Sequence, residues 1–427
     1  MPMLSRAGTP ILCCVLMLMS INANAESAET KTAHSITLKE AVTRTLAYNP
    51  QLAVIDHQRN MQRAVIDQAG LAPSPELNFS LEDLAGSGQY KGTDSVQATL
   101  GVAWILEGSI RQGRVDVARA AAQSVDVQRD VKRLDLASET ARLYTLCLAY
   151  QARQQFAEQS LKLAEDTVSA LQKRFDAGRT MAAELDRALA ELARRRLMLE
   201  DIGHELESTY RLLAAQWGDV ELKFNRVSGD IFILPEARPY AEFADGLEQN
   251  PAIQSLRSER GIRKAELELE QAQSRSPWKL NLGVRHNEAN GDQALVAGIT
   301  IPFGERSRNQ YGIARARAAL SQLTAQEQAI RVQYQSSLFV RYQEYQHSLH
   351  RIETFKTSII PRLEKALKET RRAYNIGRYS YLEWQSVQNE LLSAQRALLE
   401  ASIDAQLKII EIERLSGVPV AQSNTGS

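Results

Sequence analysis

Glu76-Leu77-Asn78-Phe79-Ser80-Leu81-Glu82 is the stretch in which this chain stops reading as a long helix. Its apolar and polar residues alternate, as expected of a strand with two different faces. Gly86, Gly88 and Gly92 follow as loop residues, and a second alternating run extends from Val96 to Trp104. The sequence therefore predicts an antiparallel hairpin. Its strands, of about ten residues each, have the length that a tilted strand needs to cross a bilayer.

A second alternating hairpin occurs in the C-terminal half of the chain. The alternation runs from Leu280 to Val284, is interrupted by Asn290-Gly291-Asp292, and resumes from Leu295 to Phe303. Both hairpins, at about 76–105 and about 279–304, interrupt otherwise helical sequence at matching places. We therefore expect these two segments to form the membrane part of the protein.

Composition and motifs limit the class of protein. Lys plus Arg and Asp plus Glu each total 51, so no net charge points to a nucleic acid or another polyanion as partner. The low aromatic content of 6% and the abundance of Ala, Leu, Gln, Glu and Arg are typical of a helix-rich protein. No GxxxxGK[ST], HExxH, GxSxG or paired CxxC motif occurs. We therefore expect neither an enzyme nor a bound cofactor or resident metal.

Residues 1–25 have the features of an export signal. Arg6 supplies a positive charge, Ile11–Ile21 is an apolar run too short to span a bilayer, and Ala23-Asn24-Ala25 fits a cleavage site. A short membrane anchor is the alternative. Cys147 is the only cysteine after this segment, which leaves no disulfide framework. No apolar run of 18 or more residues follows, so the sequence predicts an exported protein that can enter a membrane only as a barrel.

The chain reads as an internal duplication. Tyr48-Asn49-Pro50 recurs as Gln249-Asn250-Pro251, 201 residues later, and Phe175-Asp176-Ala177-Gly178-Arg179 recurs as Tyr374-Asn375-Ile376-Gly377-Arg378, 199 residues later. A spacing held this closely predicts two structural halves rather than a solenoid of short units. The predicted division is a first repeat at 26–218, a largely irregular crossover at 219–239, a second repeat at 240–417 and a disordered tail at 418–427.

Each half is predicted to contain the same elements in the same order. These are a first helix (about Leu38–Ala69 and Tyr240–Gln273), the strand hairpin, a very long helix (about Gln112–Asp176 and Asn309–Asn375), a Gly-containing turn, and a return helix (Met181–Gln216 and Tyr381–Ser416). Apolar residues in the long and return helices are spaced alternately by three and four, which is typical of coiled coils. A helix of about 65 residues reaches about 100 Å. Pro361 should kink the second long helix.

These duplicated units resemble the TolC-like outer membrane factor family over essentially the whole chain after the export signal. The more specific stretches are Pro75–Asp83, Ile301-Pro302-Phe303-Gly304 leading into Arg308-Asn309-Gln310, and Tyr374–Arg378. The first two look most like the CzcC-type subfamily, which forms the outer membrane components of heavy-metal efflux systems.

The resemblance implies a mainly α fold with a small β part. Three chains would each give four strands to one transmembrane β-barrel of twelve strands, continued by a periplasmic α-helical coiled-coil tunnel. Trimerisation would close the open edges that four strands leave in lipid. The implied partners are two further copies in a homotrimer, outer membrane lipid, a periplasmic adaptor (membrane fusion) protein and an inner-membrane RND-type pump. The protein would be a passive exit duct in a Gram-negative outer membrane.

Two candidate sites follow from the resemblance. The first is the pair of tips at 177–180 and 376–379, where Gly178, Arg179, Gly377 and Arg378 would dock on the adaptor. A glycine is also the default residue for a plain turn that needs a positive φ.

The second candidate site is a gate just inside the tips. Glu184 and Glu383 occupy equivalent positions there, with Asp186 and Arg187 as further members of an acidic and basic constriction. In a trimer the two glutamates would supply a ring of carboxylates that attracts cations. The family often has a second acid one turn beyond Glu383, where this chain has Ser386. Solvated charges on the helix surface are the alternative.

The sequence leaves three questions open. His347 and His350 are three residues apart on a helix, but two imidazoles do not make a metal site. The same channel could serve drug efflux or type I protein secretion instead of metal efflux. A soluble periplasmic coiled-coil adaptor is the alternative of a different class, and the duplicated alternating strands argue against it.

Overall fold

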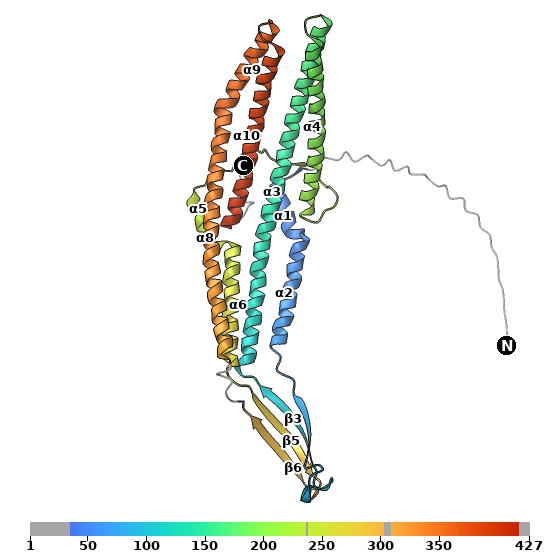
Figure 1. The fold of residues 1–427 in the computed structure, drawn as a ribbon, viewed down its shortest axis with the longest axis vertical. Helices are drawn as coiled ribbons and strands as arrows, with labels where there is room; N and C mark the ends of the chain where they lie inside the picture. Colours follow the sequence, from blue (N-terminus) through green and yellow to red (C-terminus); the bar gives the residue numbers. More distant parts are fainter. Residues whose placement is uncertain (1–34, 236–237, 303–308, 418–427) are drawn as a thin grey trace, which may run out of the picture.

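The computed structural model describes residues 35–235, 238–302 and 309–417 (Figure 1). The predicted export signal at 1–25 and the predicted tail at 418–427 lie outside the described residues, as does the end of the second predicted hairpin after residue 302. The molecule is elongated, with a β-sheet at one end and two helical tips at the other (Figure 1).

The first half contains a short strand, a broken first helix, a hairpin and two long helices. Its elements are β1 (Ser35–Ile36), α1 (Leu38–Tyr48), α2 (Pro50–Ala69), β2 (Glu76–Glu82), η1 (Gly88–Tyr90), β3 (Gln97–Leu106), α3 (Ser109–Asp176), α4 (Ala182–Ala215) and β4 (Arg226–Val227). The second half repeats this order after the crossover. Its elements are α5 (Tyr240–Gly246), η2 (Leu247–Gln249), α6 (Pro251–Gln273), β5 (Trp278–Asn287), β6 (Gln293–Thr300), α8 (Gln310–Thr354), η3 (Phe355–Ile359), α9 (Ile360–Asn375) and α10 (Tyr381–Ser416).

The sheet and the helices next to it have the same lateral order. The four strands are antiparallel in the order β2-β3-β5-β6, and β3 and β5 pair along their whole lengths, from Gln97 opposite Asn287 to Leu106 opposite Trp278. Each strand is joined in sequence to one helix, and α2 contacts α3, α3 contacts α6, and α6 contacts α8. Figure 1 shows these helices side by side above the sheet. The two predicted hairpins therefore form one layer whose outer edges are β2 with α2, and β6 with α8.

Large apolar side chains of the sheet are exposed. Every residue of β2 is exposed, including Leu77 and Phe79, and Leu295 of β6 is 89% exposed. Among the described residues, no helix is both long enough and apolar enough to cross a membrane.

The prediction of one continuous first helix in each repeat is wrong. The structure breaks both helices at the Asn of the repeated Asn-Pro pair, where Asn49 and Asn250 have ψ values of 123° and 128°. A residue before proline is disfavoured in the α conformation, because the proline ring collides with its backbone. Each Asn instead begins the next helix, since its Oδ1 accepts the N–H of Gln51 or Ala252.

The same two asparagines also bind the end of a distant helix. Asn250 is 1% exposed, and its Nδ2 donates to the carbonyls of Arg414 and Leu415 in the last turn of α10, at 2.9 and 2.8 Å. Asn49 Nδ2 donates to one carbonyl, that of Gln216 after α4, at 2.6 Å. Each amide therefore caps the start of one helix and the end of another, which joins the two ends of each repeat.

The second long helix is interrupted by the π-helical turn η3, directly before Pro361. Proline lacks the N–H that an α-helix interior requires, and a π-turn is a common local solution. Figure 1 shows the chain changing direction between α8 and α9, as Pro361 predicts.

The helix break at Asn49 or Asn250 is here called the elbow. An ion pair that follows the elbow in sequence supplies a fixed reference point in each repeat. Arg59 pairs with Asp126 at 2.7 Å, and Arg260 pairs with Glu327 at 3.1 Å, so both members recur 201 residues later. The first tip glycine, Gly178, follows Asp126 by 52 residues (178 − 126), whereas Gly377 follows Glu327 by 50 (377 − 327). The second long helix is thus two residues shorter between equivalent points.

The π-turn compensates for this difference. At about 100° per residue, a two-residue deletion would rotate the tip by about 200° relative to the elbow. A π-turn contains about one residue more than an α-helical turn. The α-helical part of the second long helix is therefore about three residues shorter than that of the first, which is close to one full helical turn. The apolar seam of α9 therefore still reaches its neighbours, and Thr370 and Tyr374 are buried.

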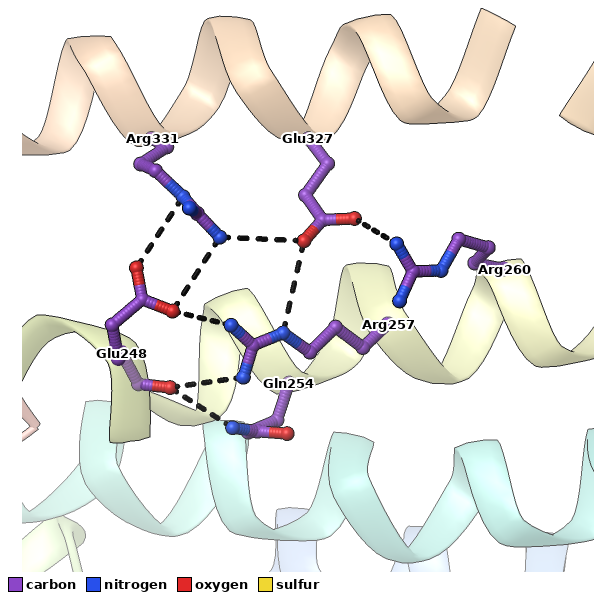
Figure 2. Close-up of polar contacts among 6 residues, drawn as sticks. All are labelled: Glu248, Gln254, Arg257, Arg260, Glu327 and Arg331. Atoms are coloured by element: carbon purple, nitrogen blue, oxygen red, sulfur yellow. Dashed lines mark hydrogen bonds and ion pairs between the residues drawn. The ribbon is translucent and has the colours of Figure 1, made fainter. Parts of the chain in front are cut away.

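Around Glu327 the duplicated pair is enlarged into a network (Figure 2). Its carboxylate, on a side chain that is 10% exposed, contacts Arg260 at 3.1 Å, Arg331 at 3.5 Å and Arg257 at 3.7 Å. Glu248 of η2 also pairs with Arg257 and with Arg331, the latter at 3.4 Å. The network ties α6 and α8 to the elbow, where the first repeat has only single pairs.

The crossover packs on the long helix instead of lying free. Its strand β4 pairs in parallel with β1, and Val227 is fully buried. The hydroxyl of Tyr144 on α3 donates to the carbonyl of Ser228. Cys147 lies in the same core, where burial raises the pKa of its thiol to about 12. Such a thiol is inert at neutral pH.

Candidate functional site at the helix tips

Both tips end in the same hydrogen-bonded turn. Gly178 has φ 67° and Gly377 has φ 78°, a left-handed conformation that a side chain would strain. Gly178 N–H donates to Phe175 O at 2.9 Å, and the next amide, that of Arg179, donates to Arg174 O at 2.8 Å. The Gly377 and Arg378 amides repeat this pattern on Tyr374 and Ala373, at 3.0 and 2.9 Å. These are Schellman motifs, and they leave all four predicted docking residues exposed at the end opposite the sheet (Figure 1).

A cluster of buried side chains, here called the tip cluster, lies just inside the tips. It holds the helical hairpin α3/α4 against the helical hairpin α9/α10. It comprises Leu171, Leu185, Ala188, Tyr374, Tyr381 and Trp384. Tyr374 and Trp384 stack with centroids 5.2 Å apart, and Tyr381 meets Trp384 edge-on at 6.1 Å. Since α3 and α4 belong to the first repeat and α9 and α10 to the second, the tip cluster couples the two repeats.

Charged groups surround the tip cluster. The Arg174 guanidinium of α3 lies 4.5 Å from the centre of the Tyr374 ring, a cation–π contact between the repeats. Burial raises the pKa of Tyr374, which Arg174 partly offsets and the Glu184 carboxylate reinforces. The pKa of Tyr381 is raised by burial first and by Glu191 second, while Arg187 opposes the shift. Both phenols therefore stay neutral at physiological pH.

The two predicted gate glutamates have different surroundings. Glu383 is exposed and forms a capping box with Ser380, whose N–H donates to the carboxylate at 2.7 Å and whose hydroxyl donates at 2.9 Å. These bonds lower the pKa of Glu383, the backbone N–H most strongly. Glu184 is half-buried and accepts the hydroxyl of Thr180. The position equivalent to Ser380 is Met181, which cannot cap α4.

The structure brings only part of the predicted gate together. Glu184 and Arg187 lie close enough to the tip cluster to act on its tyrosines. Asp186 is exposed and makes no hydrogen bond or ion pair with any other described residue. Glu383 is engaged with its own helix start. Sequence reasoning missed the tip cluster as a unit, although its signal was present in the three-and-four spacing that includes Leu171, Tyr374 and Trp384.

Potential metal ligands are dispersed in the described part of the chain. His347 and His350 are both exposed on α8, and no group of three or more His, Cys, Asp or Glu side chains that could hold a metal ion occurs there.

Comparisons with known proteins agree with this architecture. Residues 41–219 match the family model described as Outer membrane efflux protein. The cobalt-zinc-cadmium resistance protein CzcC of Cupriavidus metallidurans is 25% identical over 370 residues, covering 86% of this chain and 85% of that protein. The nickel-cobalt-cadmium resistance protein NccC of Alcaligenes xylosoxydans xylosoxydans is 23% identical over 72% of this chain and 69% of its own length.

Solved structures share the fold at low sequence identity. CusC superposes with a TM-score of 0.72 at 17% identity, covering 90% of this chain and 92% of CusC. The outer membrane protein VceC of Vibrio cholerae gives a TM-score of 0.71 at 18% identity, covering 89% and 96%. With its duplicated β-hairpins, long helices and Schellman tips, the chain resembles the outer membrane efflux proteins, and the family model itself matches residues 41–219.

Proposed function

We propose that this protein is the outer membrane exit duct of a tripartite efflux system and that its cargo is heavy-metal cations. The observation that carries the cargo assignment is the similarity along most of the chain to two proteins named for resistance to cobalt, cadmium, zinc and nickel. The duct works passively, because its role is to connect an inner-membrane RND-type pump and a periplasmic adaptor to the exterior.

The working unit in this proposal is a homotrimer. The sheet has two open edges, β2 and β6, and its exposed apolar residues need a cover. Joining β6 of one copy to β2 of the next is a head-to-tail contact, which closes into a ring when the rotation fits. Three copies would form a twelve-stranded barrel in the outer membrane with no strand edge exposed to lipid. The helix edges α2 and α8 carry exposed apolar residues, among them Met61 and Phe339, that support the same contact.

The adaptor contact and the gate are assigned to the tip end. Arg179 and Arg378 are exposed next to rigid turns, which suits a partner contact. Glu184 and Glu383 in three copies would place six carboxylates round the tunnel mouth, with Asp186 and Arg187 beside them. Such a ring favours cations over anions.

The double variant Glu184→Gln/Glu383→Gln is expected to reduce the cation preference of the purified channel. Glutamine removes the charge, and it can still reach back to the helix start in the capping box of Ser380. The reversal potential in a planar bilayer under a salt gradient measures this preference. Glu200→Gln, an exposed acid farther along α4, is the matched control. A double variant with wild-type selectivity would return both glutamates to surface charges.

Growth of a deletion strain tests the cargo. In a host that lacks related ducts, loss of the gene should cause sensitivity to a subset of zinc, cadmium, cobalt, nickel, copper and silver salts, and the gene should restore growth. Parallel plates carry antibiotics and detergents. Sensitivity to drugs alone would retain the duct and overturn the metal assignment. Sensitivity to neither class would overturn the proposed function.

A further inference from the structure

A cavity of about 270 Å³ lies between the α3/α4 hairpin and α10, away from the tip turns. Its walls are largely apolar and come from both repeats, with Phe156 on α3, Ile202 on α4 and Leu399 on α10. A smaller cavity of about 30 Å³ shares Ser160 and Arg195 with it and reaches Tyr381 of the tip cluster. The two form one groove along the junction between the repeats.

The groove carries an excess of positive charge. Three arginines and one glutamate line the larger cavity: Arg153, Arg195, Arg396 and Glu400. Arg153 pairs with Glu400 at 2.7 Å, and Arg195 pairs with Glu191 at 2.6 Å. Arg396 has no carboxylate within 4.0 Å in the described part of the chain, and its one polar contact there is the Met198 sulfur at 3.7 Å. Arg396 is an exposed, solvated arginine, and its guanidinium is therefore free to pair with an anion at the mouth of the apolar cavity.

Ser160 provides a second, independent sign of a ligand. The residue is 7% exposed and lines both cavities, and its buried Oγ has no hydrogen-bond partner among the described residues. A buried hydroxyl without a partner is destabilising, because it has lost its hydrogen bonds to water and gained none in the protein. Thr167, two turns further along α3, satisfies its hydroxyl on the Leu163 carbonyl at 2.8 Å. The open hydrogen bond at Ser160 is therefore available to a bound molecule.

We propose that this groove binds a small amphiphilic anion, with its acidic group on Arg396, its apolar body between Phe156, Ile202 and Leu399, and a polar atom on the Ser160 hydroxyl. With Arg153 and Arg195 paired to carboxylates and Arg396 left over, the lining charges favour an anion over a metal cation. Apolar walls and two separated polar groups suit an aromatic or alkyl acid better than inorganic phosphate. Because the ligand touches both hairpins, it holds them at their present spacing.

The probe is 6-hydroxynaphthalene-2-sulfonate, which carries an acidic group and a separate hydroxyl, titrated calorimetrically into the purified full-length protein in a detergent-free amphipathic polymer. The neutral isostere 6-hydroxynaphthalene-2-sulfonamide should bind at least about tenfold more weakly, since it lacks the charge that strengthens the hydrogen bond to Arg396. Arg396→Gln should weaken binding of the sulfonate to a similar extent. Arg362→Gln, which removes an exposed arginine outside the groove, should leave the Kd within about twofold.

The variant Ser160→Ala tests whether the hydroxyl binds the ligand or only supports the protein structure. It should weaken sulfonate binding about three- to tenfold, yet leave the thermal midpoint unchanged or higher, because the hydroxyl has no partner in the part of the chain that the structure describes. Absence of binding to the wild type at millimolar probe overturns the proposal. Binding that Arg396→Gln leaves unchanged also overturns it, since the probe then occupies another surface.

Discussion

Asn250→Asp is expected to lower the free energy of unfolding by about 4 kcal/mol, the largest effect of any conservative change considered for this protein. The substituted carboxylate still accepts the Ala252 N–H, but both donors are lost. It then stands 2.8–2.9 Å from the carbonyl oxygens of Leu415 and Arg414, in a position 1% exposed. The one N–H of Ala252 does not compensate for a buried anion that faces two acceptors.

Thermal unfolding followed by circular dichroism measures this loss. The matched control is Asn49→Asp, where the amide serves a single carbonyl, that of Gln216, and the residue is 7% exposed. We expect about half the effect there. The deficit of Asn250→Asp should shrink as the pH falls, because a protonated carboxyl can donate to one of the two carbonyls. The hydrogen bonds from each asparagine amide to the end of a distant helix are here called the asparagine clasp. Equal midpoints for the variant and the wild type would show that the clasp between α6 and α10 contributes little to stability.

Glu327→Ala is expected to cost about 2 kcal/mol, which is below the 3–5 kcal/mol typical of breaking a fully buried pair. The reduction reflects the arginines, whose side chains are 30–46% exposed and can recover hydration. The loss arises because three guanidinium groups share this carboxylate (Figure 2). Among the described residues, Arg260 then has no carboxylate partner, while Arg257 and Arg331 both pair with Glu248.

The internal repeat supplies the control for this measurement. Asp126→Ala removes the equivalent acid of the first repeat, which is 57% exposed and serves Arg59 alone. An exposed pair contributes about 0.2–1 kcal/mol, so we expect at most a small change in the unfolding midpoint. If both variants lose the same stability, the network around Glu327 has no advantage over a single pair.

Local patterns predicted the elements well. Alternation with a period of two identified both hairpins, and the three-and-four spacing identified the long helices, since each pattern reports which residues share a face of one element. The Asn-Pro pairs were recognised as markers of the repeat, but the helix break was missed. It could have been anticipated, because Pro50 and Pro251 disfavour helical backbone at the preceding residue.

The candidate site was less accessible to such reasoning. Glycine at the tips follows from the need for positive φ, so Gly178 and Gly377 could be identified from the chain alone. Glu184 and Glu383 looked equivalent because their positions match, yet one accepts the Thr180 hydroxyl and the other closes a capping box. The difference comes from two neighbouring residues, because Thr180 and Met181 stand where the second repeat has Tyr379 and Ser380.

The spacing of residue types predicted the order of strands, helices and turns, and the duplication itself. It could do so because secondary structure depends on neighbours a few positions apart. Contacts between distant helices could not be predicted in this way. The tip cluster, the asparagine clasps and the groove at Arg396 each join residues of separate helices, and the clasp at Asn250 spans more than 160 positions. Which residues meet there depends on how the helices pack. The spacing of residue types along the chain does not show which distant side chain will occupy the facing position.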